Sequence, residues 1–203
     1  MEGRKMRKYL IIGSLSLLFT IGCASTATYF ITPDFTGERL ILGGIAVFPV
    51  LAQETGKYEF AIESYCRSAG EKLASRLRRI QPDLRVVGPT GVGYIFDKED
   101  LVNDYSRLIE DYQAAGVLNA DISKKLSEPL GVRYFMLGRI HDLYSVGNDA
   151  NASLSIQIWD AHEAEMVFES NAEYKAAGLR TPPYDRATAK AVSEIVGRIS
   201  MAL

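Results

Sequence analysis

The sequence predicts an α/β (α+β) domain in which a mixed parallel and antiparallel sheet of about five strands is covered by helices. In the first half of the chain, short apolar runs alternate with stretches of helical periodicity, which favours helix crossovers and parallel pairing. In the second half, strict two-residue alternation with polar links predicts antiparallel hairpins. A chain of 203 residues with 47% apolar residues fits a single domain with an N-terminal extension.

The first half of the predicted domain alternates strands and helices. Residues 42–50 form a continuous apolar run, which indicates a strand buried on both faces. A turn over 51–57 leads to a helix over 58–80, in which apolar residues recur every three or four positions. Residues 84–87 are expected to form a short strand, and the glycines and proline of 88–93 interrupt regular structure.

Two helices are predicted before the next strand. Residues 97–115 have helical periodicity. A shorter helix runs to Leu130 with Asn119 or Asp121 as its N-cap. Gly131 ends that helix, because glycine adopts the left-handed conformation of a C-cap without strain.

Three strands and a final helix complete the predicted domain. Residues 134–140 are apolar, while 154–159 and 166–174 alternate apolar and polar side chains, which is typical of strands with one face on a core. Residues 184–203 form the last helix. The expected order is therefore β-α-β-α-α-β-β-β-α, and its first crossover is right-handed.

The N-terminus is organised like an export signal. Basic residues at positions 4–8 precede an apolar run over 10–21, which is shorter than the about 20 residues of a spanning helix. The run ends in Gly22-Cys23 and resembles a bacterial lipobox, with Thr20 where leucine is commonest. The resemblance implies cleavage after Gly22, and diacylglycerol and palmitate at Cys23. An ordinary cleaved signal with an incidental cysteine is the alternative.

The same resemblance indicates a location and a division of the chain. Ala24, in place of an aspartate, implies sorting to the outer membrane. The chain then consists of a signal peptide over 1–22, a lipidated tether over 23–40 and a periplasmic domain over 41–203. Residues 1–22 carry four of the 23 basic and one of the 25 acidic residues, so the mature chain has a formal charge of −5. That charge excludes a general nucleic-acid binder and a polybasic attachment to anionic lipid.

The chain has two cysteines, Cys23 and Cys66. If Cys23 carries lipid, Cys66 has no disulfide partner within the chain. An unpaired thiol in an oxidising compartment is expected to be buried. Cys66 agrees with this, because it lies on the apolar stripe of the helix predicted over 58–80.

No catalytic or metal-binding motif stands out in the sequence. The patterns of zinc proteases, dithiol oxidoreductases, α/β-hydrolases and P-loop nucleotidases are absent. His141 and Asp142 are candidates to act with a serine, but a strand-end histidine facing water is favoured. Asp160, Glu163 and Glu165 are candidates for a loose metal site, but a solvated hairpin turn is favoured. We therefore expect no enzyme activity, no metal and no cofactor.

Three residues on the helix predicted over 97–115 are candidates for partner binding. Tyr105, Arg107 and Tyr112 are residue types that are favoured in interface hot spots, so an exposed patch there would be a contact surface. Packing of the helix on a core explains the two tyrosines equally well. Trp159, at a strand end, is expected to pack in the core.

The order of these landmarks resembles a group of bacterial lipoprotein domains. An apolar strand over 45–49 ends in Phe-Pro, and residues 130–140 run from Leu-Gly-Val-Arg-Tyr to Gly-Arg-Ile. Residues 158–160 end a strand in Trp-Asp before Met-Val-Phe-Glu-Ser at 166–170, although the intervening turn lacks the usual Thr-Gly pair. Over residues 42–203 the order is similar to the lipoprotein activator of penicillin-binding proteins, the periplasmic part of the curli secretion lipoprotein, and uncharacterised proteobacterial outer-membrane lipoproteins.

The resemblance implies a function through protein contact. We expect a non-catalytic adaptor or regulator, anchored to the outer membrane through Cys23, facing the periplasm, with an envelope protein as its partner. A subunit of an oligomeric secretion assembly is the alternative, and a homo-oligomer is compatible with both. The alternating strands are needed by the core, so no hairpin pair is left to form a pore. A hydrolase or small-ligand binder would need a polar pocket that the sequence does not locate.

Overall fold

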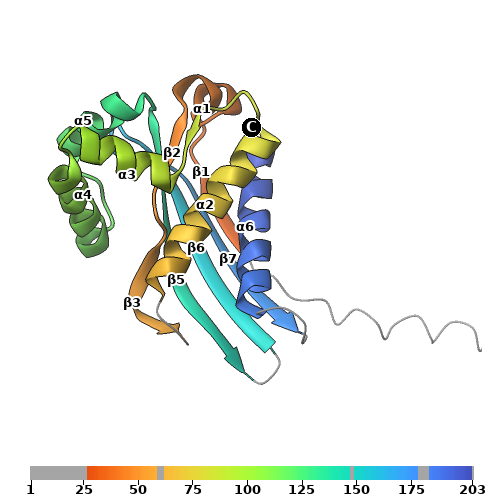
Figure 1. Cartoon of the computed structure of the whole chain (residues 1–203). Coiled ribbons are helices and arrows are strands. Elements are labelled where there is room, and N and C mark those ends of the chain that lie inside the picture. Colours follow the sequence, from red (N-terminus) through yellow and green to blue (C-terminus); the bar gives the residue numbers. More distant parts are fainter. Residues whose placement is uncertain (1–26, 59–61, 147–148, 178–182, 203) are drawn as a thin grey trace, which may run out of the picture.

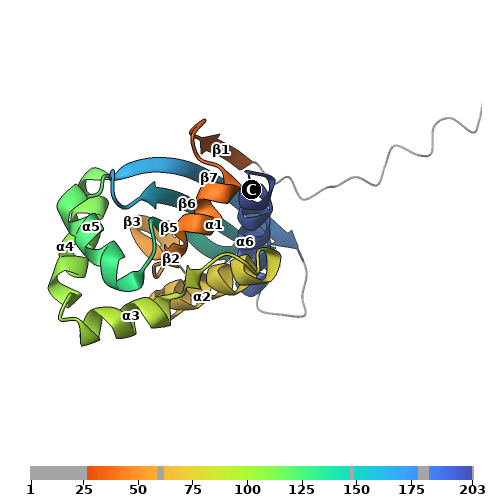
Figure 2. The ribbon, with the colours of Figure 1, turned by 90° about the horizontal axis from the view of Figure 1, so that it is seen from above.

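The computed structural model describes residues 27–58, 62–146, 149–177 and 183–202. Figures 1 and 2 show a twisted sheet with helices on both faces. The elements in chain order are β1 (Ala27–Ile31), α1 (Gly37–Gly43), β2 (Ile45–Val47), β3 (Leu51–Tyr58), α2 (Glu63–Ile80), β4 (Val86–Val87), α3 (Pro89–Lys98), α4 (Val102–Ala115), α5 (Ala120–Leu130), β5 (Tyr134–Val146), β6 (Asp149–Asp160), β7 (Glu165–Ala177) and α6 (Pro183–Ala202).

The strands form one mixed sheet, as the sequence predicts. Its order is β1-β7-β6-β5-β2-β4, and β3 pairs with β5 outside this path. The early strands pair in parallel, β2 with β4 and β5, and β3 with β5. The late strands β5, β6 and β7 pair as antiparallel hairpins. The α/β class and the single domain are confirmed, but within the described residues the sheet has seven strands rather than about five.

Part of the segment expected as a tether is built into the domain. Residues 27–31 form β1, which pairs antiparallel with the outer edge of β7 from Ala27↔Ala172 to Ile31↔Phe168. Aromatic and β-branched residues fit a pleated sheet surface, which explains why this segment adds to the available edge. α1 follows, and its N-cap Thr36 accepts a hydrogen bond from the N–H of Arg39 at 3.4 Å.

Two further segments differ from the sequence prediction. Residues 51–58 form β3 rather than a turn, with an irregular register between Ala52 and Lys57. Residues 89–98 form α3 in spite of their glycines. Pro89 occupies the first helical turn, where its fixed φ suits the helix. Val92 and Phe96 of the same helix are buried.

Two hydrophobic cores lie on opposite faces of the sheet. The first core joins α1, α2 and α6 to one face, with Ile156, Ile158 and Phe168 at its centre. The second core joins α3, α4 and α5 to the other face, around Phe48 and Phe135, whose ring centroids are 4.9 Å apart. In Figure 1 these three helices lie beside the upper part of the sheet.

Several local predictions are confirmed. The Asn119 side chain accepts a hydrogen bond from the N–H of Ile122 at 3.2 Å and so caps α5. Gly131 ends α5 with a φ of 61°. Cys66 is buried, and burial, followed by the charge of Glu63, raises the pKa of its thiol to about 11. Among the described residues, no helix combines the length and apolar character needed to cross a membrane.

Phe135→Ala should strongly destabilise the domain. The Phe135 ring is fully buried in the second core, so its removal leaves a cavity and is expected to cost about 3–5 kcal/mol. Urea unfolding followed by far-ultraviolet circular dichroism measures the change. Val117→Ala, at a half-exposed valine, is the matched control and should change stability by less than about 0.5 kcal/mol. Equal midpoints for the two variants would contradict the assignment of the second core.

Candidate functional site

The structure does not gather the predicted partner-binding residues into one exposed patch. Tyr105 lies between Phe48 and Phe96, with each ring centroid 5.5 Å away. Burial raises the pKa of Tyr105 to about 12. Tyr112 is 2% exposed, whereas Arg107 is exposed to solvent. Core packing therefore accounts for both tyrosines.

Trp159 is buried in the second core, as expected. Its ring meets Tyr112 edge to face, with centroids 6.3 Å apart. The residues predicted for signal cleavage and lipidation, Gly22 and Cys23, lie outside the described residues.

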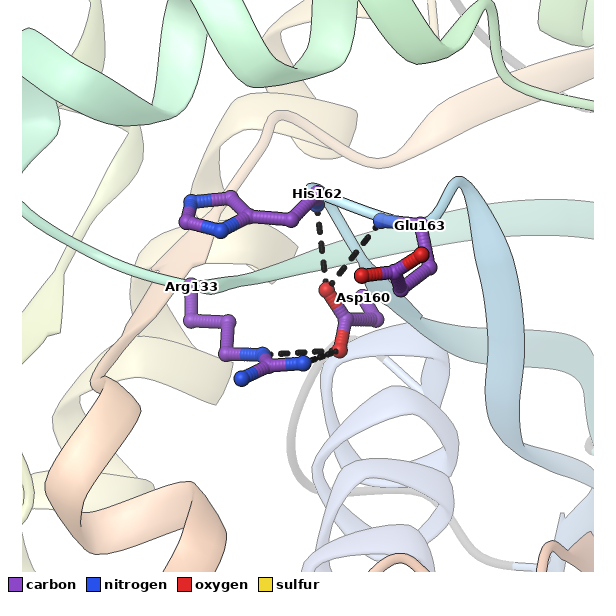
Figure 3. Close-up of polar contacts among 4 residues, drawn as sticks. All are labelled: Arg133, Asp160, His162 and Glu163. Atoms are coloured by element: carbon purple, nitrogen blue, oxygen red, sulfur yellow. Dashed lines mark hydrogen bonds and ion pairs between the residues drawn. The ribbon is translucent and has the colours of Figure 1, made fainter.

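Asp160, at the start of the β6–β7 turn, has a structural role. Figure 3 shows this carboxylate between Arg133 and the turn. One oxygen accepts hydrogen bonds from the N–H groups of His162 at 3.0 Å and Glu163 at 3.4 Å, and the other accepts from Arg133 Nε at 2.8 Å. The hydrogen bond that Arg133 donates to the Asp160 carboxylate raises the pKa of the Arg133 guanidinium. Among the described residues, no group of three or more potential ligands could hold a metal.

A polar surface occupies the half of the sheet face that α3, α4 and α5 leave open. Along β5, the second-core residues Phe135 and Leu137 are followed on the same face by Arg139 and His141. The neighbouring strands add polar residues, because Ser155 pairs with Arg139, and Gln157 pairs with Leu137 on one side and Glu169 on the other. We call the set the open-sheet cluster: Gln53 of β3, Arg139 and His141 of β5, Ser155 and Gln157 of β6, and Glu169 of β7.

His141 is held by hydrogen bonds on both ring nitrogens. Nδ1 contacts Gln53 Oε1, and Nε2 lies 2.8 Å from Ser155 Oγ. Because an amide oxygen can only accept, the Nδ1 proton is donated to Gln53 and Nε2 accepts the Ser155 hydroxyl proton. Burial and then the charge of Arg139 lower the pKa of His141, against an opposing effect of Asp142. The imidazole is therefore neutral at pH 7.

A second chain of contacts ties the cluster to α4. Arg139 donates to the backbone carbonyl of Tyr112 at 2.5 Å, and its guanidinium lies 4.2 Å from the centre of the Tyr112 ring. The Tyr112 hydroxyl donates to Gln157 Oε1 at 2.9 Å. Gln157 Nε2 donates in turn to Glu169 at 2.9 Å. The side chains of three strands and one helix thus fix one another.

Two hollows adjoin the open-sheet cluster. The smaller, of about 140 Å³, is lined by Tyr112, Arg139, His141, Ser155 and Glu169, among others. The larger, of about 460 Å³, lies between β3 and α4 and is lined by Glu54, Glu110, Gln113 and Arg139, among others. Arg139 lines both hollows, so a bound group in either one would meet its guanidinium.

His141 and Ser155 are hydrogen-bonded as a catalytic serine is to its general base, and Gln53 stands where a third group orients that base. Acyl transfer also needs donors for the developing oxyanion. Ser155 lies within β6, an interior strand paired to Arg139 on one side and Asn171 on the other. The main-chain N–H groups around it are therefore committed to the sheet, and Ser155 as a whole is 8% exposed. The arrangement suits recognition through hydrogen bonds better than covalent chemistry.

Sequence reasoning missed the open-sheet cluster although one signal was present. The polar positions of the alternating strands were interpreted as a solvated face. Arg139 and His141 are two residues apart near the end of an apolar strand, so they lie on the same face of the sheet. Two polar residues on one face indicate that this part of the face is polar. Whether Arg139 and His141 lie beside Ser155 and Gln157 depends on the strand register, which cannot be determined from a single sequence.

Comparisons with known proteins identify the fold. No protein-family model matches the chain, and no curated protein matches it. The structure is similar to a PelC dodecamer from Paraburkholderia phytofirmans, at 13% identity and a TM-score of 0.56, over 87% of this chain and 98% of that one. It is also similar to the hypothetical protein CT253 from Chlamydia trachomatis, at 15% identity and a TM-score of 0.51, over 79% of this chain and 96% of that one.

Another match is to the lipoprotein GNA1162 from Neisseria meningitidis, at 15% identity over 78% of this chain and 99% of that one. Its TM-score of 0.44 is too low to carry an argument. At these identities the comparisons establish a shared fold and nothing finer.

His141→Gln should reduce the loss of stability on acidification. The folded-state pKa of His141 is lowered, so the unfolded chain takes up the proton first and wild-type stability falls as the pH drops below the ordinary value of about 6.5. Glutamine cannot take up that proton. Urea midpoints at pH 7 and pH 5 should therefore differ less in this variant than in the wild type.

Ser155→Ala is the control for this experiment. It removes one hydrogen bond, worth about 1 kcal/mol, but keeps the histidine and its pH dependence. An identical pH dependence for wild type and His141→Gln would contradict the buried, neutral state of His141.

Proposed function

We propose that the chain is a lipid-anchored, non-catalytic lipoprotein of the cell envelope that acts through protein contact. Cys23 carries the lipid, the domain faces the periplasm from the outer membrane, and the open-sheet cluster is its contact surface. The observation that carries the proposal is the half-open sheet face, where hydrogen-bonded polar side chains are held in fixed positions. A surface with fixed donors and acceptors loses little side-chain entropy on binding, which favours specific recognition.

The charges around the two hollows indicate the chemistry of the partner. Arg139 lines both hollows, and the exposed Glu54 and Glu110 line the larger one. A partner that presents a carboxylate to Arg139 and basic side chains to the rim complements this arrangement. An adaptor or regulator of an envelope enzyme or secretion complex would use such a contact.

A second candidate function is that of a subunit in a homo-oligomeric assembly. The observation that favours it is the shared fold with a protein whose structure is a dodecamer, over 98% of that chain. In that case the partner of the open-sheet cluster is a second copy of this chain. Both candidates use the same surface and differ in the identity of the partner.

Lipidation can be tested with the two cysteines of the chain. Full-length protein expressed in a Gram-negative host with a clickable palmitate analogue should incorporate label and fractionate with the outer membrane. Cys23→Ala should lose both properties. Cys66→Ala is the matched control and should keep them, because Cys66 is buried in the first core. Label that survives Cys23→Ala would contradict the anchor.

The contact surface can be tested by photo-crosslinking in cells. A photoreactive residue at Gln113, exposed on the rim of the larger hollow, should trap the partner. The same residue at Lys124, exposed on α5, is the control and should trap far less. A distinct envelope protein trapped at Gln113 supports the adaptor, and a crosslinked copy of the chain supports the oligomer. Equal yields from both positions would contradict the open-sheet cluster as the contact surface.

A further inference from the structure

The outer edge of the sheet carries two exposed aromatic side chains. β1 lies at one end of the strand order and pairs with β7. Tyr29 is 65% exposed and Phe30 is 47% exposed. Because neighbouring residues of a strand point to opposite faces, the edge presents one aromatic ring on each side of the sheet.

The chain between the predicted lipid and this edge is very short. Three residues, 24–26, separate Cys23 from Ala27 at the start of β1. Four steps of extended chain reach at most about 14 Å, at about 3.6 Å per residue. The polar layer on each side of a bilayer is about 5–8 Å thick. A lipid on Cys23 therefore keeps the start of β1 within about 9 Å of the membrane surface.

The chemistry of the edge fits that position. Tyrosine and other amphipathic aromatic rings are enriched where headgroups meet acyl chains. Arg198 of α6 lies over the Tyr29 ring, with its guanidinium 5.5 Å from the ring centre, and pairs with Glu194. With a formal charge of −5, the mature chain gains little from anionic headgroups, so aromatic burial is the favourable contribution available at this edge.

We propose that the β1 edge is a membrane-docking surface, with Tyr29 and Phe30 seated in the headgroup region of the leaflet that holds the Cys23 lipid. This inference rests on the lipidation in the proposed function. The sheet then stands on the bilayer along its β1 edge. β5 lies three strands away, so Arg139 and His141 are held about 14 Å above that edge, at about 4.8 Å per strand, whereas Glu169 of β7 pairs directly with Phe30.

Site-directed labelling of the full-length lipidated protein tests the docking. Tyr29→Cys and Phe30→Cys are labelled separately with an environment-sensitive nitrobenzoxadiazole dye, after reconstitution in phosphatidylethanolamine–phosphatidylglycerol vesicles. Tyr94→Cys, at a tyrosine of α3 that is 70% exposed, is the matched control. Cys23 is blocked by lipid, and Cys66 is buried, so each variant takes one label.

Nitroxide-bearing phospholipid should quench the dye at positions 29 and 30, with a blue-shifted emission, and should leave position 94 unquenched. Equal, water-like emission at the three positions would overturn the docking. Shielding at 29 and 30 that persists in detergent, with disulfide crosslinks between unlabelled Tyr29→Cys copies, would overturn it in favour of a second copy at the edge.

The mass of the N-terminal peptide is measured on the same samples. A lipidated peptide with unquenched labels means that docking fails while the proposed anchor stands. An unmodified peptide means that the anchor itself fails. Circular dichroism of each variant confirms the native fold, and the two edge positions provide independent readings.

Discussion

The structure depends on β5, whose side chains alternate between the two hydrophobic cores on opposite faces of the sheet. β5 pairs with β2 and β3 along one side and with β6 along the other, so its register places three neighbouring strands. Met136 and Ile140 enter the first core, and Phe135 and Leu137 enter the second. Gly138 lies between Leu137 and Arg139, where an added Cβ would stand 2.6 Å from the Cδ1 of Ile156 and 3.3 Å from the side chain of Val50. Beyond Gly138 the second face turns polar, which sets the limit of the helical cover.

That limit creates the open-sheet cluster. Polar groups that are only half buried remain stable when they satisfy one another, and here Tyr112 links the two environments. Its ring packs in the second core, while its hydroxyl reaches Gln157. Because Arg139 is tied to the Tyr112 backbone and His141 to Ser155, the surface keeps its shape without a ligand. A surface of that kind suits a partner whose hydrogen-bonding groups match it.

Sequence reasoning recovered the elements whose signals are local. The cap at Asn119, the glycine stop at Gly131 and the alternating hairpins each depend on neighbouring residues, and each is confirmed. β1 and β3 were missed because an edge strand owes its existence to a distant partner. The three partner-binding candidates on the helix are separated by the same periodicity, because Tyr105 and Tyr112 share the stripe of Leu108 that faces the core, whereas Arg107 is exposed. The sequence did not predict the open-sheet cluster because the strand register brings its residues together from separate strands.

The proposed anchor and docking edge together restrict how copies of the chain can meet. A domain standing on β1 has one orientation relative to the bilayer, and neighbouring copies share it. Contacts between them must then run parallel to the membrane, and the surfaces that face sideways are the two faces of the sheet. A two-fold axis perpendicular to the membrane would join like surfaces, but copies related by a smaller rotation about such an axis meet with different surfaces, and these head-to-tail contacts close into rings. The open-sheet cluster on one face and the α2–α6 layer on the other are unlike surfaces of that kind. A ring of this chain would therefore join the polar open half of one sheet to the helical face of the next.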